Sequence, residues 1–258
     1  MDPSTRAVLA LLVRRTDTRW GAPYFVRTAA AETGLTRARV QQALWELASR
    51  RFAYLDPGGQ SSHDNWRWLP TEAGVRVIDS PDFEPQDPGG YLEKLAREVP
   101  DLDEFVVAYL GESLRAFDSE CYLASAVMLG VASERAFLLV ATALADWLPD
   151  DQGKQLAGLL ASPRSNFIAK FNEFRKRLEP RRNELPPELS ESLAVELDAV
   201  ADLLRTSRNE AGHPTGKGPD RGAAFVHLQL FGVYVQRLWA LRRFFLERGA
   251  NAPGLVRR

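Results

Sequence analysis

One short segment divides this sequence and limits what either side of it can form. Residues 80–90 read SPDFEPQDPGG, with three prolines, two glycines and three acidic side chains. Proline lacks a backbone donor and glycine is conformationally loose, so neither a helix nor a strand continues easily through such a run. We therefore expect two folded parts, residues 1–80 and 91–250, with a linker over 81–90 and a tail over 251–258.

The charge balance gives no support to a chain-wide affinity for nucleic acid. Lys and Arg total 33 residues, and Asp and Glu total 34. Residues 1–90 alone carry 11 side chains of each sign. Any nucleic-acid site must therefore be a local cluster of cations and not a property of the whole surface.

The most apolar region, residues 121–148, is long enough to cross a bilayer, but Glu134 and Arg135 lie in its middle. Hydrocarbon tolerates such a charged pair badly. We expect a buried core helix here, no membrane span or signal peptide, and a cytoplasmic protein. The single cysteine, Cys121, can form no intrachain disulfide, which suits a reducing compartment. Its apolar neighbours predict a small core residue.

The first part has the periodicity of three short helices. Residues 4–13 and 24–33 carry apolar side chains at helical spacing, and Gly34 suits the left-handed conformation that ends many helices. Thr36 is placed to cap a third helix. The inner face of that helix holds four apolar residues: Val40, Ala43, Leu44 and Leu47. Helix, glycine turn and helix together form the helix-turn-helix pattern.

The residues after the third helix predict a β-hairpin. Residues 52–55 (FAYL) and 66–69 (WRWL) have the alternating pattern of strands, and Asp56-Pro-Gly-Gly can turn the chain between them. Residues 31–74 resemble the winged helix-turn-helix of bacterial regulators over nearly the whole segment. Their sequence is AETGLTRARVQQALWELASRRFAYLD…WRWLPTEAG. The resemblance implies three helices plus a hairpin wing.

Five polar side chains of this part have the chemistry to contact base edges or phosphates. Four lie on the outer face of the third helix and one on the hairpin: Arg37, Arg39, Gln41, Gln42 and Arg67. The alternatives are a solvated helix face, or a winged helix that serves to dimerise the chain or to dock a partner protein.

The second part has helical periodicity almost throughout. Helices are predicted over residues 101–117, 119–147, 164–178, 188–205 and 222–247. The segment 119–147 is apolar on nearly all sides, so we place it at the centre of an all-α bundle of about five helices.

The chemistry of this part is concentrated in Arg208-Asn209-Glu210-Ala211-Gly212-His213-Pro214. Along an intact helix, Arg208 and His213 would be rotated about 140° apart. Gly212 and Pro214 break the helix and would let both side chains point at one spot. A histidine that moves a proton and an arginine that holds negative charge suit metal-free cleavage of a phosphodiester.

This motif, on a helical bundle, resembles the arginine–polar–histidine signature of HEPN ribonucleases. The segment CYLASAVMLGVASERAFLL also resembles the long central helix of bacterial members, and the likeness covers residues from about 100 to 247. It implies a homodimer with a composite cleft, and cleavage of RNA in which the 2′-hydroxyl attacks the adjacent phosphate. By position, Arg208 would orient that phosphate, Asn209 would support it and His213 would be the acid or base. Glu134 is a weaker addition, a lone carboxylate on an apolar helix with Arg208 as one candidate partner.

The bare spacing of this motif is not specific. Arginine is frequent in the chain, and about one match is expected by chance. A second match runs from Arg221 to His227. There a glycine follows the arginine, and His227 lies on a helix expected to face the core, among Phe225, Leu228 and Leu230. The first match is preferred because an amide side chain directly follows its arginine and the helix breaks there.

A basic stretch in residues 164–182 could lead RNA to such a cleft. Its phenylalanines are expected to face inward on an amphipathic helix while its cations face water. The cations selected as candidate phosphate contacts are Arg175, Lys176, Arg181 and Arg182.

Two functions from different classes fit these patterns. The first is a metal-independent endoribonuclease of a bacterial defence or toxin system, a hydrolase that binds RNA and uses its winged helix for DNA, regulation or a partner protein. The second is a non-catalytic DNA-binding regulator or adaptor whose helical part dimerises or senses a partner. Three scattered histidines and one cysteine predict neither a metal site nor a cofactor.

Overall fold

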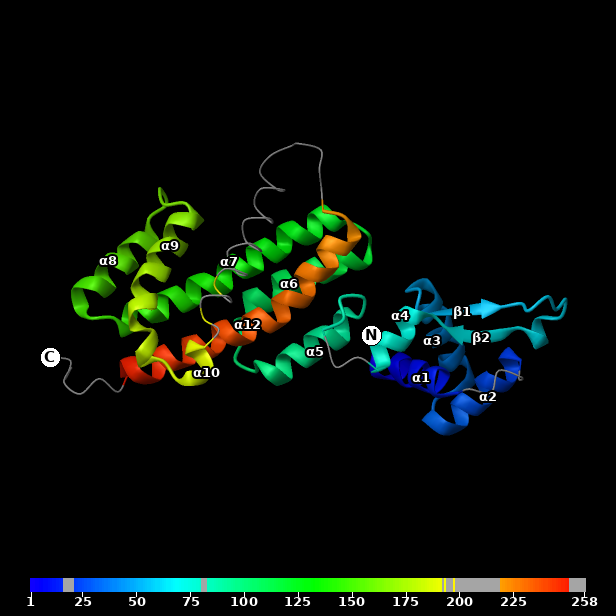
Figure 1. Cartoon of the computed structure of the whole chain (residues 1–258). Helices are drawn as coiled ribbons and strands as arrows, with labels where there is room; N and C mark the ends of the chain where they lie inside the picture. The colour runs from blue at the N-terminus through cyan, green and yellow to red at the C-terminus, as the bar shows by residue number, and fades with distance from the viewer. Residues whose placement is uncertain (16–20, 80–82, 192, 194–196, 198–218, 251–258) are drawn as a thin grey trace. The chain divides into compact units, whose positions relative to one another are not determined.

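The computed structural model describes residues 1–15, 21–79, 83–191, 193, 197 and 219–250. These residues are mainly helical and include one two-stranded antiparallel sheet (Figure 1). The expectation of a mainly α-helical chain is therefore confirmed. The chain divides into two compact units, Met1–Glu93 and Lys94–Arg258, which are described separately.

Three short helices open the first unit: α1 (Pro3–Arg14), α2 (Ala22–Thr33) and α3 (Arg37–Ser49). The carboxylate of Asp2 caps α1 by accepting hydrogen bonds from the backbone N–H groups of Ser4 and Thr5. The hydroxyl of Thr36 caps α3. Gly34 ends α2 with a left-handed φ of 72°. The predicted cap and the predicted glycine turn are both confirmed.

A β-hairpin follows, formed by β1 (Ala53–Asp56) and β2 (Arg67–Pro70), each one residue further along than predicted. The strands pair antiparallel, with Ala53 opposite Pro70 and Asp56 opposite Arg67. Their connection contains the short 3₁₀ turn η1 (His63–Asn65), and α4 (Glu72–Asp79) follows β2. A Cβ atom on Gly74 would lie 2.1 Å from the carbonyl oxygen of Phe52, so α4 lies very close to the start of the hairpin.

Apolar faces of α1, α3 and the hairpin form the core of the first unit. The fully buried residues include Val8, Leu9, Leu44, Leu47 and Phe52. All four residues predicted for the inner face of α3 are buried. Burial of this face fixes which side of α3 remains outside.

The segment expected as a linker, residues 81–90, differs from that expectation in its described part. Phe83 and Asp87 are buried, and the ring of Phe83 lies 4.7 Å from that of Tyr91. Asp87 accepts a hydrogen bond of 2.9 Å from Arg6 and one of 2.6 Å from the amino group of Met1. Helix α5 (Pro88–Glu98) begins here because proline is tolerated in a first helical turn. The observed division falls within α5, between residues 93 and 94.

The second unit is a bundle around one long helix. Its described elements are α6 (Glu104–Asp118), α7 (Tyr122–Trp147), α8 (Asp150–Ala161), α9 (Phe167–Leu178), η2 (Glu179–Glu184), α10 (Pro187–Ser190) and α12 (Arg221–Ala250). Helix α7 contacts α6, α8, α9 and α12, so its predicted central place is confirmed (Figure 1). The predicted helix over 188–205 lies largely outside the described residues.

Within the described part of the chain, α7 is the one helix long and apolar enough to cross a membrane. More than half of that apolar window, 56%, is buried inside the unit, as in a core helix. Arg135, near its middle, is half-buried and forms an ion pair of 2.8 Å with Asp103, the residue that caps α6. The hydrogen bond from Arg135 is the main cause that lowers the pKa of Asp103. The charge in the middle of α7 therefore connects two helices.

Two expectations for this unit need correction. Cys121 is exposed, because α7 begins one residue later and Cys121 belongs to the turn between α6 and α7. Helix α8 was not expected, although it packs closely: a Cβ atom on Gly153 would lie 2.3 Å from the carbonyl oxygen of Ala145. The two glycines of α8 weaken its helical pattern in the sequence, yet one of them makes its contact with α7 possible.

Candidate nucleic-acid interface

The predicted catalytic motif lies outside the described residues, and with it Arg208, Asn209 and His213. Glu134, the fourth residue of that set, is half-buried on α7. The second arginine–histidine match is described at the start of α12. His227 is half-buried there and Leu228 is buried, but Leu230 is 49% exposed. This face of the helix, expected to face the core, is therefore only partly buried.

The basic stretch along α9 and η2 is engaged within its own unit. Phe167, Phe171 and Phe174 are buried, which confirms their predicted inward orientation. The predicted phosphate-binding cations have partners close by: Arg175 with Glu179, Lys176 with Glu173, Arg181 with Glu184, and Arg182 with the backbone carbonyls of Ser190 and Glu191. Binding a phosphate here would have to compete with these contacts.

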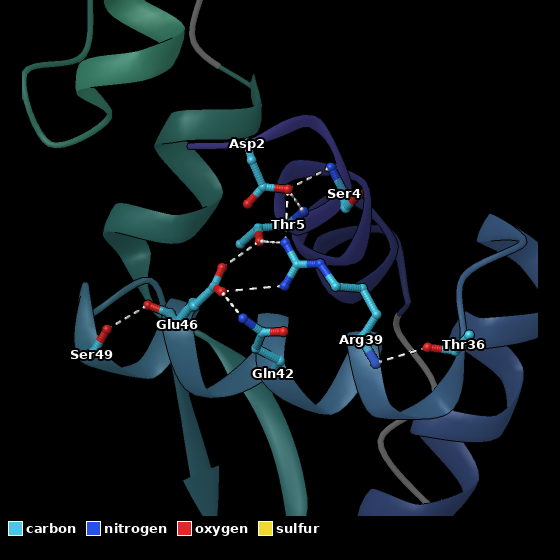
Figure 2. Close-up of polar contacts among 8 residues, drawn as sticks. All are labelled: Asp2, Ser4, Thr5, Thr36, Arg39, Gln42, Glu46 and Ser49. Atoms are coloured by element: carbon cyan, nitrogen blue, oxygen red, sulfur yellow. Dashed lines mark hydrogen bonds and ion pairs between the residues drawn. The ribbon is translucent and has the colours of Figure 1, made fainter.

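Arg39, one of the residues predicted to contact nucleic acid, turns toward α1 instead (Figure 2). The guanidinium of Arg39 forms ion pairs of 2.8 Å with Asp2 and 3.2 Å with Glu46, and donates to the hydroxyl of Thr5 at 3.1 Å. Thr5 is buried and donates in turn to Glu46 at 2.7 Å. Gln42 donates to the same carboxylate. We call these five residues the α1–α3 polar network.

The network lowers the pKa of Asp2. Partial burial alone would raise the pKa of Asp2, but hydrogen bonds from Thr5 and Arg39 outweigh it and lower the pKa from 3.8 to about 2. The hydrogen bond to Asp2 is also the main cause that raises the pKa of Arg39. Asp2 therefore stays charged in the folded unit well below the pH at which a free aspartate takes up a proton.

Arg67 is also held locally. It lies opposite Asp56 in the hairpin and forms an ion pair of 3.0 Å with it. Such cross-strand pairs stabilise a hairpin. The structure thus gives Arg67 a role within the hairpin. Of the five residues predicted for nucleic acid, Arg37, Gln41 and Gln42 are exposed on α3, and Gln42 is hydrogen-bonded to Glu46.

Beside Arg37 and Gln41 the surface is hollowed into a groove between α2, α3 and the hairpin, with a volume of about 750 Å³. Its aliphatic lining includes Val26, Leu44 and Leu55. Its aromatic walls are Trp45, His63, Trp66 and Trp68, and its charged groups are Arg27, Arg37 and Asp64. We call this the aromatic groove.

The hairpin wall of the groove is fixed to the start of α2. The backbone N–H of Ala22 donates to the carbonyl of Trp66. A Cβ atom on Gly21 would lie 1.7 Å from the carbonyl oxygen of Asp64, so only glycine permits this approach. The indole N–H of Trp66 donates to the carbonyl of Gln60 at 3.0 Å. Contacts within the unit therefore hold the hairpin wall of the groove against α2.

Sequence reasoning missed the aromatic side of this site. Trp45, Trp66 and Trp68 fall within 24 residues of sequence, yet only Trp68 is buried, while Trp45 is 62% exposed. A tryptophan on the outer face of a predicted helix is the signal that could have found the groove, because a large exposed aromatic side chain indicates a binding surface.

Comparisons of the chain with protein-family models, with characterised proteins and with solved structures find no match.

The α1–α3 polar network predicts a particular dependence of stability on pH. Asp2 has a lower pKa in the folded unit than in the unfolded chain, so its ionic contribution is complete above about pH 4. It disappears as the pH falls toward 2. Asp2→Asn keeps the helix cap but loses the charge. We expect its melting temperature to be below that of the wild type at pH 5–7, and the two to converge near pH 2.

Asp79→Asn, which changes an exposed acid of α4, is the control and should follow the wild type at every pH. A constant gap between Asp2→Asn and the wild type down to pH 2 would contradict the ionic role of Asp2. The measurement is calorimetric melting from pH 7 to pH 2.

Proposed function

We propose that the first unit is a winged helix-turn-helix module that binds nucleic acid through α3 and the hairpin. The observation that carries the proposal is the division of α3: Arg39 is bound to Asp2 within the unit, while Arg37 and Gln41 lie exposed beside the groove. Residues four apart share a helix face, so both can meet one ligand. The order of helix, helix, glycine turn, helix and hairpin also fits this module.

For the second unit we propose a metal-independent endoribonuclease of HEPN type, active as a cytoplasmic homodimer in a bacterial defence or toxin system. The sequence motif from Arg208 to His213 supports this, together with the helical bundle around α7. In the proposed reaction the 2′-hydroxyl of RNA attacks the adjacent phosphorus and the 5′-oxygen of the next nucleotide leaves, so that a 2′,3′-cyclic phosphate remains. His213 would carry the proton, and Arg208 would hold the charge on the phosphate oxygens.

The alternative is a non-catalytic regulator or adaptor in which the second unit dimerises the chain or senses a partner. In both proposals the first unit binds nucleic acid. Only cleavage of RNA distinguishes the enzyme from the non-catalytic alternative.

Arg37→Ala tests the binding surface. Loss of one charge-assisted phosphate or base contact should weaken binding of a fluorescein-labelled oligonucleotide by about tenfold. It should also reduce the slope of log affinity against log salt by about one. The measurement is fluorescence anisotropy over a range of salt concentrations. Arg76→Ala, at an exposed arginine of α4, is the matched control and should bind as the wild type does. Equal binding by both variants would remove Arg37 from the interface.

The ribonuclease is tested with purified full-length protein, a mixed RNA pool and EDTA. Cleavage should survive EDTA and leave cyclic phosphate ends. It should fall by about 100-fold or more in His213→Ala, which loses the general acid or base, and in Arg208→Ala, which loses the charge that stabilises the phosphate oxygens. The second arginine–histidine match supplies the controls, because Arg221→Ala and His227→Ala should still cleave. No cleavage by the wild type, or cleavage by Arg208→Ala and His213→Ala at the wild-type rate, would favour the non-catalytic alternative.

A further inference from the structure

The aromatic groove has features that contact with the outside of a continuous duplex does not require. In a duplex the faces of the bases are stacked on one another, and a protein reaches only their edges and the phosphates. The groove is instead a hollow surface lined by three tryptophans, Trp45, Trp66 and Trp68. Flat aromatic walls of this kind suit a base that has left its stack.

Trp45 is the clearest of these features. Its side chain is 62% exposed, although it belongs to a helix whose inner face is fully buried. The ring meets the buried Trp68 edge-on, with centroids 5.2 Å apart and planes at 86°. This contact orients the indole and leaves most of its surface open. An oriented, exposed indole gains from a flat partner that covers it.

The charges around the groove select the partner. Arg37 and Arg27 are both exposed at the groove, and the guanidinium of Arg27 is placed 5.3 Å from the ring centre of Tyr24. Among the described residues that line the groove, Asp64 carries the one carboxylate. The groove therefore combines aromatic faces with a net positive rim. A nucleotide matches both, through its flat base and its phosphate, whereas an uncharged apolar peptide would leave the arginines unused.

We propose that the aromatic groove binds one unpaired nucleotide of a single-stranded segment, with the base against Trp45 and its phosphate between Arg27 and Arg37. The volume of about 750 Å³ lies in the range of sites that hold small ligands. This inference rests on the proposed nucleic-acid role of the first unit and names its substrate class. The unit then prefers single strands, or duplexes with unpaired bases, to continuous duplex.

The test compares a fluorescein-labelled twelve-nucleotide oligo-dT strand with a blunt DNA duplex of equal length, at one salt concentration, with full-length protein. DNA probes avoid cleavage by the proposed ribonuclease. The wild type should bind the single strand more tightly. Trp45→Ala should weaken single-strand binding by about tenfold or more and change duplex binding less than about twofold. Trp45→Phe keeps an aromatic face and should retain most of the affinity.

Tyr54→Ala is the matched control, because Tyr54 is 48% exposed on β1 and does not line the groove. Its single-strand affinity should equal that of the wild type. Melting curves of all three variants establish that each is folded.

The two proposals fail in different ways. If Arg37→Ala weakens binding of both probes but Trp45→Ala weakens neither, nucleic-acid binding by the first unit is supported. Binding of an unpaired base in the groove is then contradicted. Wild-type preference for the duplex, or equal losses on both probes in Trp45→Ala, also overturns it. If the wild type binds neither probe, the proposed function itself fails, and a peptide becomes the candidate occupant of the groove.

Discussion

The exposed surface of the first unit depends on the polar network that joins α3 to α1. Arg39 and Glu46 meet the buried Thr5 and the capping carboxylate of Asp2, while the apolar face of α3 is buried in the core. The polar network and the buried apolar face occupy two sides of α3. The side that remains carries Arg37, Gln41 and Trp45, and it borders the aromatic groove. The network thus determines which residues of α3 are available to a ligand.

The hairpin completes this surface because its long connection is anchored to the start of α2. The close approach at Gly21 and the hydrogen bond from Ala22 hold His63 and Trp66 in place. A groove wall held in this way needs less ordering on binding, which lowers the entropic cost of association. In the second unit, by contrast, most cations of the basic stretch along α9 and η2 form ion pairs within the unit. Binding and chemistry are accordingly assigned to different units in our account.

Local signals in the sequence predicted the features that depend on neighbouring residues: the cap at Thr36, the turn at Gly34 and the central helix α7. Features that depend on distant contacts were not predictable. Arg37 and Arg39 look alike in the sequence, and only the packing of α1 against α3 separates them. Phe83 and Asp87 read as parts of a linker, but tertiary contacts with Tyr91 and Arg6 bury them. Cys121 was misplaced because its exposure depends on where α7 begins.

The central claim is that nucleic acid binds on α3 and the hairpin, and the most direct measurement is hydrogen–deuterium exchange of the full-length protein with and without a saturating oligo-dT strand. Our account predicts slower exchange in peptides that cover residues 37–45 and 60–68, because bound nucleic acid shields the groove. Peptides from α9 and η2 should exchange as before. Protection confined to residues 167–184, with no change at α3 and the hairpin, would contradict the account.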